Sequence, residues 1–145
     1  MIRPMKVLVC GAGGFIGGHL VADLISQGHA VTAVDLKPRP EWYQLAPQAR
    51  NLVLNLQDLA ACRIATQDVD YVYNLAADMG GMGFIENNKA LCMLSVLINT
   101  HLLQAANESG VQRFFYASSA CVYAADKQTT TENPGLKESD AYPAM

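Results

Sequence analysis

The chain has 145 residues, of which 51% are hydrophobic and 16% are charged, so it can bury one substantial core but not two. Its net charge of -3 at pH 7 offers no basic face for a phosphate backbone, and we expect no nucleic-acid partner. The 4 cysteines are widely spaced, without a Cys-x-x-Cys pair or a histidine at metal-ligand spacing. This pattern predicts no metal site and indicates reduced thiols in a cytoplasmic protein.

Apolar runs alternate with segments of helical periodicity along the chain. Residues 5–10 form an apolar run that ends in glycines, which is typical of a buried parallel strand feeding a phosphate loop. Gly28 and Gly110 stand where the caps of two helices belong. The remaining pattern predicts strands over 30–34, 52–54, 71–75 and 113–117, and helices over 15–27, 59–65 and 87–109. This alternation predicts an α/β fold, a Rossmann-type doubly wound parallel sheet with about five strands and helices on both faces.

The longest predicted helix also has the length of a membrane span, because residues 90–107 carry no formal charge. Polar side chains interrupt this stretch, however, and no aromatic belt flanks it. We therefore expect a helix packed against the sheet and no membrane partner. The interrupting residues are Asn99, Thr100, His101, Gln104 and Asn107.

A glycine-rich loop follows the first predicted strand and opens the first predicted helix. The first glycine of such a loop permits a tight turn, a residue without Cβ lets the backbone approach a pyrophosphate, and the last lets helix and strand pack closely. The helix N-terminus presents free N–H groups to the anion. The alternative is a glycine-rich turn with no ligand. We predict dinucleotide contacts for Gly11, Gly13, Gly14, Phe15, Ile16 and Gly17.

Asp35 ends the second predicted strand about twenty residues into the glycine motif, where a carboxylate binds the ribose hydroxyls of an adenosine. This position favours NAD, because the 2'-phosphate of NADP would meet like charge. Lys37 and Arg39 follow closely and could soften the preference. The alternative for Asp35 is a solvated turn residue at a strand end.

Asn55 and Leu56 follow the third predicted strand. The glycine spacing 11, 14 and 17 resembles that of extended short-chain dehydrogenases, which commonly carry an Asp-Leu or Asp-Ile pair here that binds adenine. The amide oxygen of Asn55 can still accept a hydrogen bond from the adenine amino group, so we expect a weakened contact. Asp58 is as well suited to capping the helix that follows.

Three blocks of sequence carry a more specific resemblance. The glycines at 11, 14 and 17 have the spacing typical of extended short-chain dehydrogenases, and Asn-Leu-Ala-Ala over 74–77 is a common ending of their fourth strand. The segment Asp-Met-Gly-Gly-Met-Gly-Phe-Ile over 78–85 resembles a loop of the GDP-mannose 3,5-epimerase family. The segments over 113–123 and 136–141 are similar to the same family. The resemblance therefore covers nearly the whole chain.

That resemblance implies a set of site residues and a reaction. Leu75, Ala76 and Ala77 would contact NAD, whereas Gly80 and Ala120 would contact the sugar nucleotide. Ser119 and Cys121 would bind substrate and act as catalysts, the serine at a hydroxyl and the cysteine as an acid or base at a ring carbon. The implied reaction is transient oxidation of GDP-mannose at carbon 4, inversion at carbons 3 and 5, and reduction at carbon 4. The alternatives without a role in catalysis are a mobile surface loop for the segment over 78–85 and a small buried packing residue for Cys121.

The family also implies parts that this sequence lacks. A catalytic Tyr-x-x-x-Lys on a long helix would come after Met145, so the chain is expected to be truncated relative to the family and inactive alone. Tyr123 and Lys127 match the motif literally but stand in a loop-like context, and we reject that pair. We divide the chain into an NAD-binding core over 1–125 and a loop over 126–145 leading towards the catalytic helix and substrate domain. The full-length protein is expected to be a homodimer.

Two other functions stay open at this point. One is a different NAD-dependent nucleotide-sugar enzyme of the same superfamily, such as a 4-epimerase or a 4,6-dehydratase. The other is an NAD-binding module without chemistry, against which Ser119 and Cys121 argue because a sensor needs neither.

Overall fold

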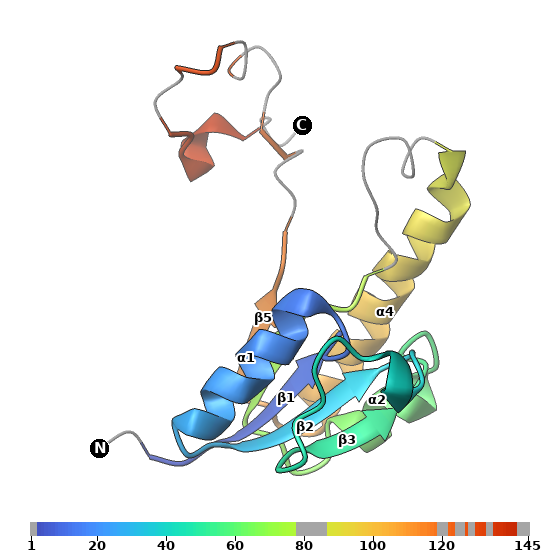
Figure 1. Cartoon of the computed structure of the whole chain (residues 1–145). Helices are drawn as coiled ribbons and strands as arrows, with labels where there is room; N and C mark the ends of the chain where they lie inside the picture. The colour runs from blue at the N-terminus through green and yellow to red at the C-terminus, as the bar shows by residue number, and fades with distance from the viewer. Residues whose placement is uncertain are drawn as a thin grey trace.

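A computed structural model describes residues 3–77, 87–118, 122–123, 127, 130–132 and 135–141. Its five strands form one parallel sheet in the order β3-β2-β1-β4-β5. Figure 1 shows α1 on one face of this sheet and α2 with α4 on the other. The predicted Rossmann-type α/β fold is therefore confirmed. The elements are β1 (Lys6–Cys10), α1 (Phe15–Ser26), β2 (Ala30–Asp35), η1 (Arg39–Glu41), β3 (Arg50–Val53), α2 (Leu59–Ala65), β4 (Tyr71–Asn74), α4 (Lys89–Glu108), β5 (Arg113–Tyr116) and η4 (Glu138–Asp140).

Two apolar clusters cover the two faces of the sheet, and β1 contributes to both. Val7 and Val9 pack on the α1 side, whereas Leu8 and Cys10 pack on the α2 and α4 side. This alternation follows from the two-residue period of a strand. All four side chains are buried, so β1 is the central strand that both layers of helices require.

The third strand begins two residues earlier than predicted. The sequence pattern indicated 52–54 because those residues are apolar, whereas β3 runs Arg50–Val53. Its pairing with β2 runs from Thr32 opposite Arg50 to Asp35 opposite Val53. In the described part of the sheet β3 is an edge strand, and an edge strand tolerates polar residues that an apolar pattern does not detect.

The long helix α4 uses one side to cover the sheet. Ser95, Ile98, Leu102, Ala105 and Ala106 are its buried residues. Its length and composition alone would also allow a membrane span. Of its most apolar stretch of 18 residues, 28% is buried inside the structure. The packing of Leu102 and its neighbours into the shared core agrees with the expected sheet-packed helix. Gly110 follows α4 with a φ of +73° and donates its N–H to Asn107, as predicted for a helix end.

The chain crosses back over the sheet after β3 and places β4 on the other side of β1. Between these two strands the direction of winding changes. In open α/β sheets, ligands bind at such a switch point, outside the carboxyl ends of the strands. The residues beyond β5 include an isolated antiparallel bridge between Tyr123 and Ala141, and Figure 1 shows η4 away from the sheet. The division at residue 125 stays a prediction.

Candidate functional site

The glycine loop turns sharply at the end of β1. The backbone N–H groups of Gly11 and Ala12 both donate to the Val34 carbonyl of β2, at 2.9 and 3.0 Å. Gly11 has a φ of +78°, and a Cβ at this position would lie 2.9 Å from the carbonyl carbon and oxygen of Leu75. The backbone of β1 therefore approaches the end of β4 too closely for any side chain at position 11.

Gly17 lets the first turn of α1 rest on this loop. A Cβ at residue 17 would lie 2.2 Å from the Gly11 carbonyl oxygen and 2.8 Å from the Cα of Ala12. Gly14 precedes the helix as its N-cap, with no side-chain cap. The first N–H groups of a helix have no partner within that helix. The arrangement brings a helix N-terminus, which attracts anions, down to the end of β1.

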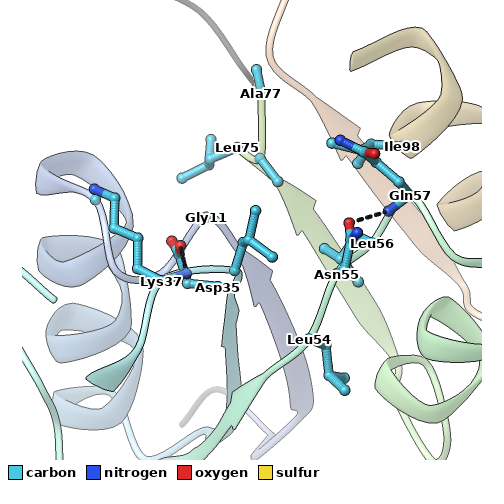
Figure 2. A pocket seen from close by; sticks show the side chains of 13 residues that line it. Gly11, Asp35, Lys37, Leu54, Asn55, Leu56, Gln57, Leu75, Ala77 and Ile98 are labelled. Carbon is cyan, nitrogen blue, oxygen red and sulfur yellow. Dashed lines mark hydrogen bonds between the residues drawn. The ribbon is translucent and has the colours of Figure 1, made fainter. Parts of the chain in front are cut away.

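A cavity of about 310 Å³ opens beside this loop at the carboxyl ends of the strands. Figure 2 shows Asp35 and Leu75 on the side of the glycine loop, with Asn55 and Gln57 across from them. The lining combines a mostly apolar wall with a few polar groups, as ligand sites commonly do. The lining residues are Gly11, Gly14, Asp35, Leu36, Lys37, Leu54, Asn55, Leu56, Gln57, Leu75, Ala76, Ala77 and Ile98.

Most of the residues predicted to hold a dinucleotide line this one cavity, but four do not. Gly13 and Gly17 shape the loop instead of lining the cavity. The side chains of Phe15 and Ile16 are 61% and 69% exposed at the start of α1. Ligand contacts by these four residues stay predictions.

The Asp35 carboxylate is held from two directions. Its Oδ2 accepts the Gly13 backbone N–H at 2.9 Å, and its Oδ1 accepts the Lys37 backbone N–H at 3.0 Å. Each carboxylate oxygen can accept a further hydrogen bond. The side chain therefore presents fixed acceptors to the cavity that it lines, as the recognition of vicinal hydroxyl groups requires.

The loop after β3 is fixed by side chains that bond to the backbone. Asn55 Oδ1 accepts the Gln57 N–H at 3.0 Å, and the Gln57 carbonyl oxygen lies 2.9 Å from His101 Nδ1 of α4. Asn55 Oδ1 can still accept a second hydrogen bond. Asp58 caps α2, because its Oδ1 accepts the Ala60 N–H at 2.9 Å. The capping alternative for Asp58 is thus confirmed.

A second cavity of about 260 Å³ lies on the other side of the segment that follows β4. Leu75, Ala76 and Ala77 line both cavities and form a wall between them. Asn74 anchors this wall, since its Oδ1 accepts the Ala76 N–H at 3.1 Å and its amide donates to the side chain of Asn99. The other lining residues are Asn74, Ser95, Asn99, Tyr116, Ala117 and Ser118.

The predicted catalytic and substrate-binding residues Gly80, Ser119, Ala120 and Cys121 lie outside the described residues. Of the other cysteines, Cys10 and Cys62 are free and buried. Burial raises the pKa of the Cys62 thiol to about 11 and raises that of Cys10 further, so both stay protonated at neutral pH. Neither is a nucleophile. Within the described ranges, no group of three or more His, Cys, Asp or Glu residues could hold a metal ion.

Tyr123 and Lys127 have the contacts of a loop pair. Tyr123 forms the bridge with Ala141, and Lys127 Nζ makes an ion pair with Asp140 at 2.8 Å. The rejection of this pair as a catalytic Tyr-x-x-x-Lys stays a prediction.

Sequence reasoning missed several lining residues. Leu36, Leu54 and Gln57 stand directly beside predicted site residues at strand ends, so chain adjacency could have found them. Ile98 and Asn99 come from α4, more than twenty residues from the nearest lining residue of β4 in sequence. No local pattern marks such residues, because their role depends on how a helix crosses the sheet.

The Gly17 contact predicts that substitution by alanine destabilises the protein much more at Gly17 than at the neighbouring Gly18 of α1. Gly17→Ala forces a Cβ into the Gly11 carbonyl and should lower the free energy of unfolding by about 1–3 kcal/mol. Gly18→Ala is the matched control, since its nearest contact would be the Gln44 Cβ at 3.1 Å and alanine favours a helix. It should change stability by less than about 1 kcal/mol. Urea unfolding measures both, and equal effects would contradict the close packing described here.

The comparisons with known proteins agree with this geometry. The GDP-mannose 3,5-epimerase of Arabidopsis thaliana is 43% identical over 141 residues, covering 97% of this chain and 37% of that protein. A UDP-glucose-4-epimerase from Stenotrophomonas maltophila, solved with bound NAD and formylated UDP-arabinopyranose, superposes with a TM-score of 0.77 at 26% identity, covering 97% of this chain and 43% of that one. The UDP-glucose 4-epimerase of Thermus thermophilus, in complex with NAD, shares the fold with a TM-score of 0.80 at 24% identity, covering 94% of this chain and 44% of that one.

The chain thus spans well under half the length of the curated relatives it matches. A family model described as the NAD dependent epimerase/dehydratase family matches residues 7–145. With its glycine loop, its parallel sheet and this match over almost all of its length, the chain belongs to the NAD dependent epimerase/dehydratase family, whose cofactor is NAD.

Proposed function

We propose that the chain is the NAD-binding part of a nucleotide-sugar epimerase, and that the whole protein inverts carbons 3 and 5 of the hexose in GDP-mannose. The observation that supports NAD binding by this chain is the cavity at the carboxyl edge of the sheet, which is lined by the glycine loop, Asp35 and the 75–77 wall. The 43% identity to the Arabidopsis thaliana GDP-mannose 3,5-epimerase supports GDP-mannose as the substrate of the whole protein.

The residues around the larger cavity fit an adenine dinucleotide. The contacts that a Cβ would make at Gly11 and Gly17 mark the tight turn and the close helix–strand packing that a dinucleotide-binding loop needs. In this proposal the glycine loop and the N-terminus of α1 bind the pyrophosphate, and Asp35 accepts hydrogen bonds from the adenosine ribose. Asn55 Oδ1 accepts from the adenine amino group in addition to the Gln57 N–H.

The nicotinamide and sugar would then lie towards the second cavity, because that cavity shares the 75–77 wall with the first. When bound, NAD supplies a reversible hydride acceptor for a sugar carbon. Gly80 and Ala120 contact the sugar nucleotide, and Ser119 Oγ holds a sugar hydroxyl in place. Cys121 Sγ moves a proton at carbon 3 or carbon 5 once the neighbouring carbon is a ketone. Ser118, which lines the second cavity, directly precedes this segment in sequence.

The whole protein is proposed to be a homodimer that forms through the outer side of α4. Met93, Val96 and Leu103 are exposed there, on the side of the helix opposite the residues buried on the sheet. Exposed apolar stripes of this kind mark protein interfaces. Sedimentation velocity of the whole protein tests the proposal, since Met93→Glu combined with Val96→Glu should convert the dimer to a monomer, and an intact dimer would contradict it.

A cytoplasmic location is proposed as well. It rests on the free state of Cys10, Cys62 and Cys92, which suits a reducing compartment. Cell fractionation of the tagged protein tests it, and recovery in a secreted fraction would contradict it.

The other candidate is a different nucleotide-sugar epimerase or dehydratase, which the similarity to the NAD-bound UDP-glucose-4-epimerase structure favours. An NAD-binding module without chemistry is the remaining alternative. Assays of the whole protein with GDP-mannose, UDP-sugars and dTDP-sugars separate these functions, because turnover of a UDP-sugar alone would contradict GDP-mannose as the substrate.

Asp35 should set the preference for NAD over NADP. Asp35→Asn removes the charge that a 2'-phosphate would meet and weakens the charge-assisted hydrogen bonds to the ribose. We expect NAD to bind about tenfold more weakly and NADP to bind more tightly. Asp23→Asn, at an exposed position of α1, is the charge-matched control and should leave both affinities unchanged. Isothermal titration of the wild-type chain and both variants with NAD and with NADP measures these affinities, and an unchanged preference for NAD in Asp35→Asn would refute the proposed role of Asp35.

Cys121 should act at a ring carbon and not in NAD binding. The test protein is a chimera in which this chain replaces the matching 141 residues of the Arabidopsis thaliana epimerase. We expect GDP-mannose turnover by the chimera and none by the 145-residue chain alone, because we reject Tyr123 and Lys127 as the catalytic pair. In Cys121→Ala, entry of solvent deuterium at carbon 3 or carbon 5 should fall about 100-fold or more, while NAD binding and oxidation at carbon 4 persist.

Cys92→Ala is the control for this experiment, since Cys92 is a half-buried cysteine of α4. It should leave deuterium exchange unchanged. Unaltered exchange at both carbons in Cys121→Ala would make Cys121 a packing residue, and turnover by the isolated chain would show that the chemistry lies elsewhere.

A further inference from the structure

Trp42 contacts both of the segments that hold the Asp35 carboxylate. Its side chain is 8% exposed, although it follows the short helix η1 in a surface connection. The indole Nε1 donates to the Lys37 carbonyl oxygen at 2.8 Å. The neighbouring ring carbon faces the glycine loop, where a Cβ on Gly13 would lie 2.9 Å from the indole Cδ1. The indole therefore packs against the backbone of Gly13 and is bonded to the backbone of Lys37.

These two contacts involve the same residues that donate to Asp35. Gly13 N–H donates to Oδ2 and Lys37 N–H donates to Oδ1. The backbone closes the arrangement, because the N–H of the residue after Trp42 donates to the Gly13 carbonyl oxygen at 3.0 Å. A ring of contacts thus runs from the glycine loop to Asp35, on to Lys37, through the indole and back to the glycine loop. Trp42 itself does not line the cavity.

We propose that Trp42 is a positioning residue that sets the orientation of the Asp35 carboxylate and thereby the readout of the adenosine ribose hydroxyls. The proposal rests on the proposed role of Asp35 in ribose binding. Without the indole N–H, the Lys37 carbonyl loses its hydrogen bond to Trp42, and the backbone N–H that donates to Oδ1 is held less firmly. A carboxylate that can turn makes a poorer acceptor pair for two hydroxyls, because the cost of orienting it is then met at binding.

The experiment compares ADP with 2'-deoxy-ADP, which differ only in one of the two ribose hydroxyls that Asp35 is proposed to recognise. The wild-type chain should bind ADP about tenfold more tightly than 2'-deoxy-ADP. Trp42→Phe keeps an aromatic ring against Gly13 and removes the N–H donor. In this variant the ratio of the two affinities should fall below about threefold, with most of the loss in ADP binding. Equal weakening of both nucleotides, with the ratio kept at about tenfold, would mean that Trp42 only supports the fold and would overturn the proposal.

Two further variants separate this proposal from the function on which it rests. Tyr73→Phe, in β4, also removes one polar group from a half-buried aromatic residue and should keep the tenfold ratio. Asp35→Asn should abolish most of the preference for ADP over 2'-deoxy-ADP. A wild-type chain that does not distinguish the two nucleotides would contradict the role of Asp35 itself, whereas a ratio lost in Asp35→Asn but kept in Trp42→Phe would contradict only the role of Trp42.

The wild-type chain offers a second readout, which does not depend on the variant folding. Trp42 is the chain's 1 tryptophan, so its indole N–H gives a single side-chain resonance of its kind in a nitrogen-proton NMR spectrum. Saturating ADP should shift this resonance more than saturating 2'-deoxy-ADP does. An indole resonance that responds equally to both nucleotides would contradict coupling between Trp42 and the ribose hydroxyl.

Discussion

The first turn of α1 rests directly on the backbone at the end of β1, and the rest of the site depends on that contact. A side chain at Gly17 would overlap the Gly11 carbonyl, and one at Gly11 would overlap the Leu75 backbone. Three segments, the β1 turn, the α1 N-terminus and the end of β4, therefore meet with no side chain between them. Because they meet so closely, the N–H groups of a helix start face a cavity bounded by strand ends.

The parallel sheet explains why the residues that line the first cavity come from segments that are distant in sequence. In a parallel sheet all strands end at one edge, so Asp35 of β2, Asn55 after β3 and Leu75 after β4 reach one cavity. The wall over 75–77 is shared with the second cavity, and the bond between Asn74 and Asn99 ties that wall to α4. The order of the strands thus places the first cavity next to the second, which suits the proposed meeting of cofactor and sugar.

Much of this could be predicted from the sequence, because the relevant signals are local. The helix over 59–65 was predicted with the bounds that α2 has, since Asp58 caps it and an apolar side repeats at helical spacing. The place of Asp35 beside the cavity could be predicted from its distance along the chain to the glycine loop. The first two residues of β3 could not be predicted, because a polar edge strand is defined by its pairing with β2 and not by its composition. Ile98, Asn99 and the Trp42 contact with Lys37 also depend on tertiary packing that no periodicity encodes.

The central claim is that the cavity beside the glycine loop holds the adenosine half of NAD. A nitrogen-proton NMR titration of the chain with NAD tests it most directly, because it locates the binding site residue by residue. We expect the largest shifts at the backbone amides of Gly11, Gly14 and Ala76, with little change at Gly110, which follows α4 and does not line the cavity. Shifts confined to the outer side of α4, or no shifts at saturating NAD, would contradict it.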